Sequence, residues 1–328
     1  MGLLDVQELR TYYTTLRGNV RAVDGVTFTV KHGEATGLAG ESGCGKTTVA
    51  TSILRILSSG GKIVGGKILF NGLDIVGLDE VEMRERIRWK EISIVFQGAM
   101  NALNPVFRVS DQIVEAITLH EPEVSRKAAY ERAEKLFELV GIDSSRVGNY
   151  PHEFSGGMRQ RAMIAMALAS NPSVLIADEP ATALDVIVAA QVLKLMRELK
   201  SKLNLGMILI THDLSIIAEV CEICAIMYAG KIAEYGNVVT IFKDPLHPYT
   251  QGLMSAFPSI NAKERMRMVS IPGAPPDLLD PPNACRFNPR CRHAKDICRS
   301  QDPPYTELEK GHFVSCHMAV ATYEGKKW

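Results

Sequence analysis

Up to about residue 235 the chain alternates between two patterns of hydrophobic and polar positions. Short apolar runs rich in β-branched residues recur between segments with helical spacing, which predicts an α/β fold with a largely parallel sheet. The runs predict strands at residues 35–39, 68–70, 92–96, 174–177 and 207–210. Residues 224–228 and 231–235 flank an Ala-Gly turn, which predicts a β-hairpin.

A helical stretch separates the third and fourth of these predicted strands. Ser125 is a suitable N-cap, apolar residues follow at spacings of three to four, and Gly141 ends the pattern. We therefore expect a helical subdomain, at about residues 98–168, inserted into a larger domain of residues 1–243. Eleven of the 16 prolines follow residue 243, which predicts a mostly irregular extension over residues 244–328.

Composition narrows the classes of protein. The 328 residues are 46% hydrophobic and 23% charged, and 37 basic residues balance 37 acidic ones. A folded protein without a global basic field for nucleic acid is expected. No apolar run approaches the length of roughly 18 residues that a membrane span needs, and acidic residues stand where a secretory signal would be basic. We expect a cytosolic protein that does not cross a membrane.

Residues 40–47 read Gly-Glu-Ser-Gly-Cys-Gly-Lys-Thr and match the phosphate-loop pattern G-x-x-x-x-G-K-[ST]. The string follows a predicted strand and precedes a predicted helix at residues 47–57. Glycines let backbone N–H groups point into one concavity, to which a helix N-terminus adds positive partial charge. Lys46 would reach the β and γ phosphates and Thr47 would ligate Mg²⁺. The string predicts a nucleoside triphosphate site.

Residues 174–179 read Val-Leu-Ile-Ala-Asp-Glu, an apolar run that ends in two acids. A buried strand of this kind delivers carboxylates to its C-terminal edge. Beside a phosphate loop, Asp178 would support the Mg²⁺ shell and Glu179 would be the general base that polarises the attacking water.

Residues 154–161 read Phe-Ser-Gly-Gly-Met-Arg-Gln-Arg and begin a further predicted helix. Ser155 and the amides of Gly156 and Gly157 would form a second anion site on the same chain. The string resembles the signature motif of ATP-binding cassette (ABC) ATPases. The resemblance implies a P-loop cassette with a RecA-like core, an antiparallel β subdomain and a helical subdomain. It also implies a head-to-tail dimer in which each signature closes over the partner's phosphate loop.

The same resemblance extends to single positions between residues 3 and 240. Gln97 is similar to the glutamine that contacts Mg²⁺ or the lytic water, Asp185 to the aspartate of the D-loop, and His212 to the histidine at the γ-phosphate. Tyr13, with Tyr12 beside it as an alternative, is similar to the aromatic that stacks on adenine. The residues expected at the nucleotide are Tyr13, Gly40, Glu41, Ser42, Gly43, Cys44, Gly45, Lys46, Thr47, Thr48, Gln97, Ser155, Gly156, Gly157, Gln160, Asp178 and Asp185. Those expected in catalysis are Glu179, His212, Lys46 and Gln97, and those expected at Mg²⁺ are Thr47, Gln97 and Asp178.

Two strings resemble one branch of the family. Residues 150–161 and the string His-Pro-Tyr-Thr-Gln-Gly-Leu at residues 247–253 are similar to the oligopeptide, dipeptide and nickel importers. This implies an ATPase subunit that energises import of peptides, or of oligosaccharide or nickel. It would lie at the cytoplasmic face of the membrane with a second homologous ATPase, two membrane permeases and an external solute-binding protein. The alternative, a soluble ATPase acting on nucleic acid or ribosomes, is disfavoured because Gln97 and Ser155 are only 58 residues apart, too few for a long coiled-coil insert.

Four of the seven cysteines stand near the end of the chain: Cys285, Cys291, Cys298 and Cys316. Four thiolates can hold zinc or an iron-sulfur cluster, and no pair here has the close spacing of a zinc knuckle. Within residues 286–299, five basic residues outnumber one acid, which would compensate an anionic cluster. The pattern resembles the 4Fe-4S motif of some peptide-importer ATPases and implies a structural cluster. Zinc and free or paired thiols are the alternatives.

Overall fold

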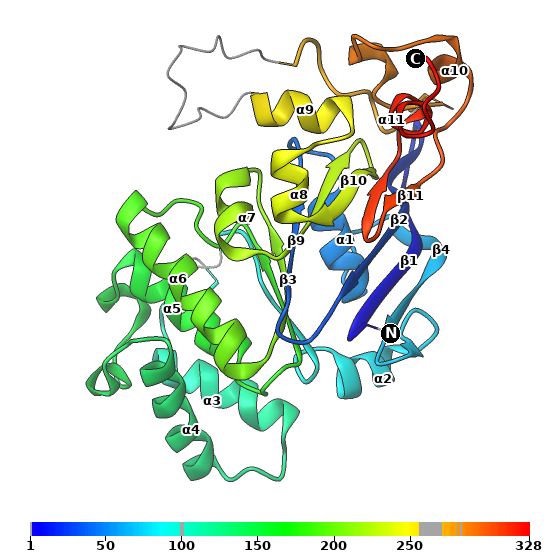
Figure 1. Cartoon of the computed structure of the whole chain (residues 1–328). Coiled ribbons are helices and arrows are strands. Elements are labelled where there is room, and N and C mark those ends of the chain that lie inside the picture. The colour runs from blue at the N-terminus through cyan, green and yellow to red at the C-terminus, as the bar shows by residue number, and fades with distance from the viewer. Residues whose placement is uncertain (1, 99–101, 256–270, 280, 283) are drawn as a thin grey trace. The chain divides into compact units, whose positions relative to one another are not determined.

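The computed structural model describes residues 2–98, 102–255, 271–279, 281–282 and 284–328 (Figure 1). Its mixed α/β architecture confirms the predicted fold class. The chain forms two compact units, one of Met1–Leu4, Val30–Ala35 and Phe70–Thr211, the other of Asp5–Thr29, Thr36–Leu69 and His212–Trp328. Residues 99–101 of the expected helical subdomain and 256–270 of the expected extension lie outside the described residues. Over the described part of the chain, no helix has the length and apolar character needed to span a membrane.

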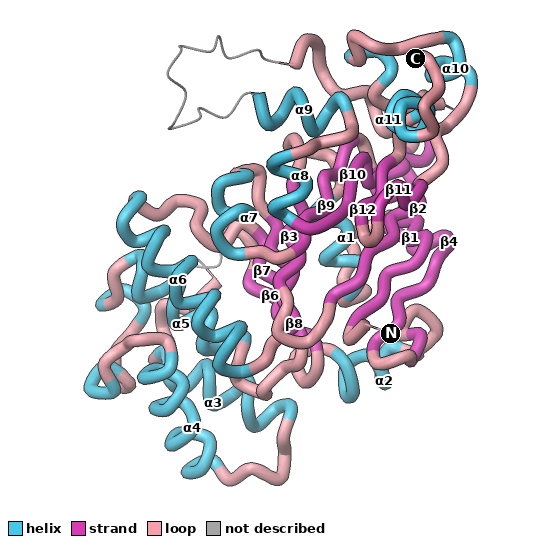
Figure 2. Tube along the Cα trace, viewed as in Figure 1, coloured by secondary structure: helices cyan, strands magenta, loops and turns pink. Residues whose placement is uncertain are grey.

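The first unit contains a parallel sheet and a group of helices (Figure 2). Its strands are β5 (Leu73–Asp74), β6 (Ile92–Val95), β7 (Val174–Asp178) and β8 (Gly206–Ile210). Its helices are α2 (Glu80–Glu82), α3 (Val109–His120), α4 (Arg126–Leu139), α5 (Gly156–Ala167) and α6 (Val186–Leu203), with a π-helical turn at Met83–Ile87 and 3-10 turns at Ser144–Arg146 and Pro151–Glu153. Strands β8, β7 and β6 lie side by side in this order, and all residues of β7 and β8 are buried. The predicted central strands are confirmed.

The helices α3, α4 and α5 pack on one another and contain the helix predicted from residues 125–141. The hydroxyl of Ser125 accepts the Ala128 N–H, and Gly141 has a left-handed φ of 72° after the last turn. Apolar residues at helical spacing, Ala133 and Phe137 among them, are fully buried. The local signals of this helix therefore agree with its packing.

The second unit contains two sheets. Its strands are β1 (Leu4–Thr15), β2 (Gly18–Val30), β3 (Ala35–Ala39), β4 (Gly61–Phe70), β9 (Ile223–Tyr228), β10 (Lys231–Asn237), β11 (Thr306–Glu309) and β12 (His312–Val314). Its helices are α1 (Lys46–Ile53), α7 (Leu214–Val220), α8 (Val238–Lys243), α9 (Pro248–Ser255), α10 (Asp296–Ser300) and α11 (His317–Tyr323), with a 3-10 turn at Asn288–Arg290. One sheet has the order β2-β1-β4 and the other β11-β12-β10-β9-β3.

Three features of the second unit refine the sequence prediction. The hairpin is confirmed, since β9 and β10 pair antiparallel around Ala229 and Gly230. The proline-rich extension contributes more regular structure than expected, because β12 pairs with β10 and β11 with β12. The predicted helix at residues 47–57 is too long: α1 ends at Ile53, and Arg55 adopts a left-handed φ of 53° that a helix does not tolerate.

Candidate nucleotide-binding site

The phosphate-loop pattern lies between strand β3 and helix α1 of the second unit. Gly40, Gly43 and Gly45 have φ values of 147°, 76° and 105°, which favour glycine. Close packing excludes a side chain at two of them: a Cβ at Gly40 would lie 2.1 Å from the Met227 carbonyl oxygen, and one at Gly45 would lie 2.2 Å from the Ala22 carbonyl oxygen. The motif glycines are therefore required by the loop's own fold.

The lysine of the pattern lies inside this loop. The Lys46 ammonium donates to the carbonyl oxygens of Gly40 and Glu41, at 2.8 and 3.0 Å, and the residue is only 7% exposed. The neighbouring Cys44 is buried, and its burial raises the pKa of the thiol. Ser42, in the loop, and Thr47, in the first turn of α1, are exposed residues. The loop thus presents a positive charge, a helix N-terminus and hydroxyls, the elements of a phosphate site.

The acidic pair lies at the C-terminal edge of the parallel sheet in the first unit. Asp178 is the last residue of β7 and is 2% exposed. The Glu179 N–H donates to the Ile210 carbonyl oxygen at 2.8 Å, and its Oε2 accepts a hydrogen bond from Gln97 Nε2 at 3.0 Å. The structure therefore joins two predicted catalytic residues that are 82 positions apart in sequence.

A residue that the sequence reasoning missed completes this arrangement. The Thr182 hydroxyl donates to the same Oε2 of Glu179 at 2.9 Å. Glu179 itself has a left-handed φ of 48°, a conformation that costs about 1–3 kcal/mol for a residue with a side chain and is concentrated at functional sites. The available signal was a hydroxyl three positions after the acid, which is too common a pattern to single out. Two side chains and the backbone fix the orientation of the Glu179 carboxylate.

The signature string forms the start of helix α5. Ser155 is its exposed N-cap, and its hydroxyl accepts the Met158 N–H at 3.3 Å. A Cβ at Gly157 would lie 2.5 Å from Val188 Cγ1, so the close approach of α6 requires glycine. Gln160 is buried, and Asp185 caps α6 by accepting the Val188 N–H at 2.9 Å. The exposed N-terminus of α5 beside Ser155 has the character of a second anion site.

The remaining predicted contacts are Tyr13 and His212. Tyr13 is half-buried on β1, and a Cβ at Gly61 would lie 2.7 Å from its ring, so the ring lies against glycine backbone. The hydroxyl of Tyr12 is engaged with Asp24 Oδ1 at 2.8 Å. His212 is exposed and follows the buried Thr211 at the end of β8.

The four C-terminal cysteines converge on one part of the second unit. The Cys285 N–H donates to the Cys298 carbonyl oxygen at 3.2 Å, and Cys298 and Cys316 are buried. Burial, with a smaller contribution from the other cysteines, raises the pKa of Cys285 to about 12 and that of Cys316 to about 11. Thiol side chains are the donor type that zinc or an iron-sulfur cluster requires. Within the described ranges, however, no three His, Cys, Asp or Glu side chains are arranged to hold a metal ion.

These features together define an ATP-binding cassette. They are the phosphate loop between a strand and a helix that begins with lysine, the acid pair at the end of a parallel strand, and the signature string at the start of a second helix. The ABC transporter family matches residues 23–182, and the family of the oligopeptide/dipeptide transporter C-terminal region matches residues 233–298. This chain belongs to the ABC transporter ATP-binding proteins of the oligopeptide and dipeptide type.

Close relatives and solved structures agree with this assignment. The oligopeptide transport ATP-binding protein OppD of Escherichia coli (strain K12) is 45% identical over 97% of this chain and 94% of its own length. The dipeptide transport ATP-binding protein DppD of the same organism is 42% identical over 98% of both chains. The ABC transporter subunit cbiO1 of Clostridium perfringens has a TM-score of 0.63 and 28% identity, over 74% of this chain and 91% of its own. The dimeric bacterial cassette MJ0796, at 24% identity and a TM-score of 0.63 over 72% of this chain and 98% of its own, shares the fold.

Proposed function

We propose that this chain hydrolyses ATP as a subunit of an importer that takes up peptides, at the cytoplasmic face of the cell membrane. The observation that carries the proposal is the contact of Gln97 with Glu179 in a chain that also holds the phosphate loop and the signature string. Relatives named for oligopeptide and dipeptide transport match nearly the full chain, which supports peptides as cargo. Oligosaccharide and nickel are the other solutes that the branch suggests.

In this proposal the phosphate loop at residues 40–48 and the acid pair act on one ATP molecule, whose adenine stacks on Tyr13. Glu179 accepts a proton from the attacking water, because Gln97 and Thr182 orient its carboxylate. Lys46 and His212 stabilise the charge of the γ-phosphate as the bond to ADP breaks. Thr47, Gln97 and Asp178 would supply the oxygen ligands of Mg²⁺, which would neutralise phosphate charge.

We further propose that the ATP site is completed by a partner. Ser155, Gly156, Gly157 and Gln160 would contact the nucleotide of a second, homologous ATPase, with Asp185 beside the dimer contact. Ser155 is exposed, and the two large apolar residues Val186 and Ile187 are 85% and 72% exposed. Adjacent exposed apolar residues support the proposal that a partner subunit covers this surface. A heterodimer of two related ATPases is the form we propose.

The helical subdomain is the part we assign to the membrane permeases. A cavity of about 630 Å³ lies on it, and its lining includes Phe107, Gln112 and Arg126. Phe107 is 55% exposed, and its neighbour in sequence, Val106, is 70% exposed, so two adjacent apolar side chains are available for a protein contact. In the proposed domain organisation, residues 1–243 form the cassette, with the helical subdomain at about 98–168, and residues 244–328 form the extension.

Co-purification tests this proposal against its alternative. We expect the full-length chain, expressed from its native locus with an affinity tag, to be recovered with two polytopic membrane proteins and a second cassette ATPase. Recovery with nucleic acid or ribosomes, and without membrane proteins, would instead support a soluble ABC ATPase of the non-transport class.

For the four C-terminal cysteines we propose a structural 4Fe-4S cluster that crosslinks the extension. The spacing of the four cysteines in the sequence supports this ligand set. We expect chain purified without oxygen to show visible absorbance that dithionite bleaches, with about four iron and four sulfide per chain. The variant Cys291→Ser should lose the absorbance, and the matched variant Cys221→Ser, in the cassette, should keep it. Zinc without sulfide in the wild type would contradict the cluster and favour the zinc alternative.

A further inference from the structure

The second residue of the phosphate loop, Glu41, is held by a residue 249 positions away. Arg290 Nη1 donates to Glu41 Oε2 at 2.7 Å, and its Nη2 donates to Oε1 at 3.0 Å. The Arg290 side chain is 5% exposed and that of Glu41 is 28% exposed. A two-point guanidinium-carboxylate pair of this kind fixes orientation as well as distance.

A second contact fixes the backbone of the same residue. The Glu41 N–H donates to the hydroxyl oxygen of Tyr249 at 3.1 Å. Tyr249 is fully buried and belongs to the His-Pro-Tyr-Thr string, which the proposed hydrolysis reaction does not otherwise use. Side chain and main chain of Glu41 are thus both attached to elements outside the loop.

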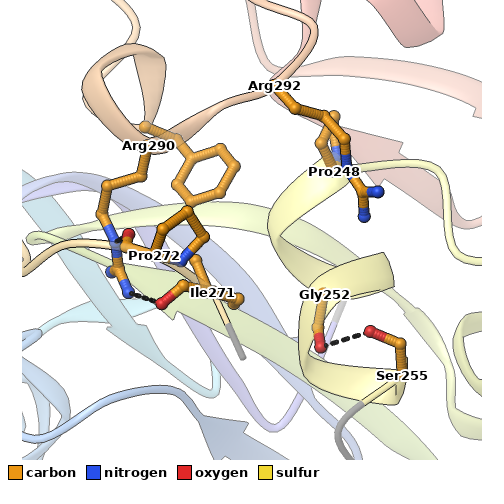
Figure 3. A pocket seen from close by; sticks show the side chains of 8 residues that line it. Pro248, Gly252, Ser255, Ile271, Pro272, Arg290 and Arg292 are labelled. Carbon is orange, nitrogen blue, oxygen red and sulfur yellow. Dashed lines mark hydrogen bonds between the residues drawn. The ribbon is translucent and has the colours of Figure 1, made fainter. Parts of the chain in front are cut away.

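Arg290 and Tyr249 are themselves rigidly placed. The Arg290 guanidinium donates to the carbonyl oxygens of Pro272 and Ile271, at 2.8 and 3.4 Å, as Figure 3 shows beside a cavity of about 270 Å³. It also lies over the Tyr228 ring, 5.7 Å from the centroid. The Tyr249 N–H donates to His247 Nδ1 at 3.0 Å, and burial lowers the pKa of His247 to about 4, which keeps this ring nitrogen an acceptor.

The segment that carries Arg290 is the cysteine-rich part of the extension. Arg290 directly precedes Cys291, and Phe287 packs on Tyr249 with a ring distance of 5.4 Å. A second arginine in this segment, Arg286, donates to the carbonyl oxygen of Ala229 in the turn between β9 and β10. The next residue of that turn, Gly230, donates its N–H to the Cys44 carbonyl oxygen at 2.9 Å. The extension therefore contacts the phosphate loop directly through Arg290 and contacts, through Arg286, the hairpin turn that bonds the loop at Cys44.

We propose that Arg290 and Tyr249 are positioning residues for ATP binding: the cysteine-rich extension holds the phosphate loop in its binding conformation through Glu41. This proposal rests on the ATP site proposed above. It assigns a role in nucleotide binding to two parts of the chain outside the ATP-binding motifs: the His-Pro-Tyr-Thr string at the start of helix α9 and the segment between the first two C-terminal cysteines.

The test is a fluorescence titration of the full-length chain with mant-ATP and Mg²⁺. We expect Arg290→Ala to raise the Kd about tenfold, because the loop loses its two-point contact and samples other conformations. Arg290→Lys, which keeps the charge and loses the fork, should give an intermediate Kd. Tyr249→Phe, which keeps the ring and removes only the acceptor oxygen, should raise the Kd severalfold without a change in far-UV circular dichroism. Arg292→Ala, an exposed arginine two residues on, is the matched control and should bind as the wild type does.

A double-variant cycle separates positioning from a general effect on folding. If Arg290 acts through Glu41, Arg290→Ala should add little to the Kd of Glu41→Gln. Fully additive effects, or wild-type affinity in both Arg290→Ala and Tyr249→Phe, would overturn the proposal. A wild-type chain that fails to bind mant-ATP would instead contradict the proposed ATP site, so the two failures are distinguishable.

Discussion

Glu179→Gln is expected to lower steady-state ATP turnover of the assembled importer at least about 100-fold, the range typical for loss of a general base. The carboxylate of Glu179 accepts hydrogen bonds from Gln97 and Thr182 and is held on a backbone with a left-handed φ of 48°. Glutamine has nearly the same shape and hydrogen-bonding reach but does not accept the proton from water. ATP binding should therefore persist while hydrolysis stops.

Turnover is measured by phosphate release at saturating ATP, with mant-ATP binding measured in parallel. Glu198→Gln is the matched control, because it makes the same chemical change at a side chain that is 61% exposed on the outer surface of α6. Phosphate release at the wild-type rate by Glu179→Gln would refute the assignment of the general base. A variant that lost both binding and turnover would point to a structural role for the carboxylate.

The second large effect is expected at the phosphate loop. Gly40→Ala places a Cβ 2.1 Å from the Met227 carbonyl oxygen, at a φ of 147° that residues with side chains rarely adopt. Because the obstacle is backbone of the neighbouring strand β9, relief requires that the loop itself move. We expect mant-ATP affinity to fall by about 100-fold or more and the melting temperature to fall as well.

Gly77→Ala provides the control for this second prediction. No atom lies within 4 Å of a Cβ built at Gly77, so the same substitution there should leave affinity and melting temperature unchanged. Near-normal affinity in Gly40→Ala would show that the loop binds nucleotide in a conformation different from the one described, and would contradict the requirement for glycine.

Local patterns in the sequence predicted the parts of the fold that depend on near neighbours. The strand β7 and the helix α4 were found because a fully buried strand and a capped amphipathic helix each carry a distinct local signal. The strands β1 and β2 were missed, since long strands with half-exposed residues show no continuous apolar run. The overlong prediction for α1 failed at Arg55, where the chain turns into left-handed geometry without a glycine to mark it.

The site was predictable to the extent that its chemistry follows a motif. The phosphate loop, Asp178 and Glu179 could be placed from spacing and residue type alone. The pairing of Gln97 with Glu179 depends on the adjacency of β6 and β7, which the sequence does not state. The contact of Arg290 with Glu41 is still less accessible, because it joins residues 249 positions apart through a segment with little regular structure.

Uptake by reconstituted vesicles tests the central claim most directly. The vesicles would contain this chain with its partner ATPase, the two permeases and the solute-binding protein, and accumulation of a labelled oligopeptide would be measured with ATP on the cytoplasmic side. We expect accumulation with ATP and none with a non-hydrolysable analogue or with Glu179→Gln. Equal accumulation in all three cases, or rapid ATP hydrolysis with no accumulation of peptide, would contradict a peptide importer driven by this ATPase.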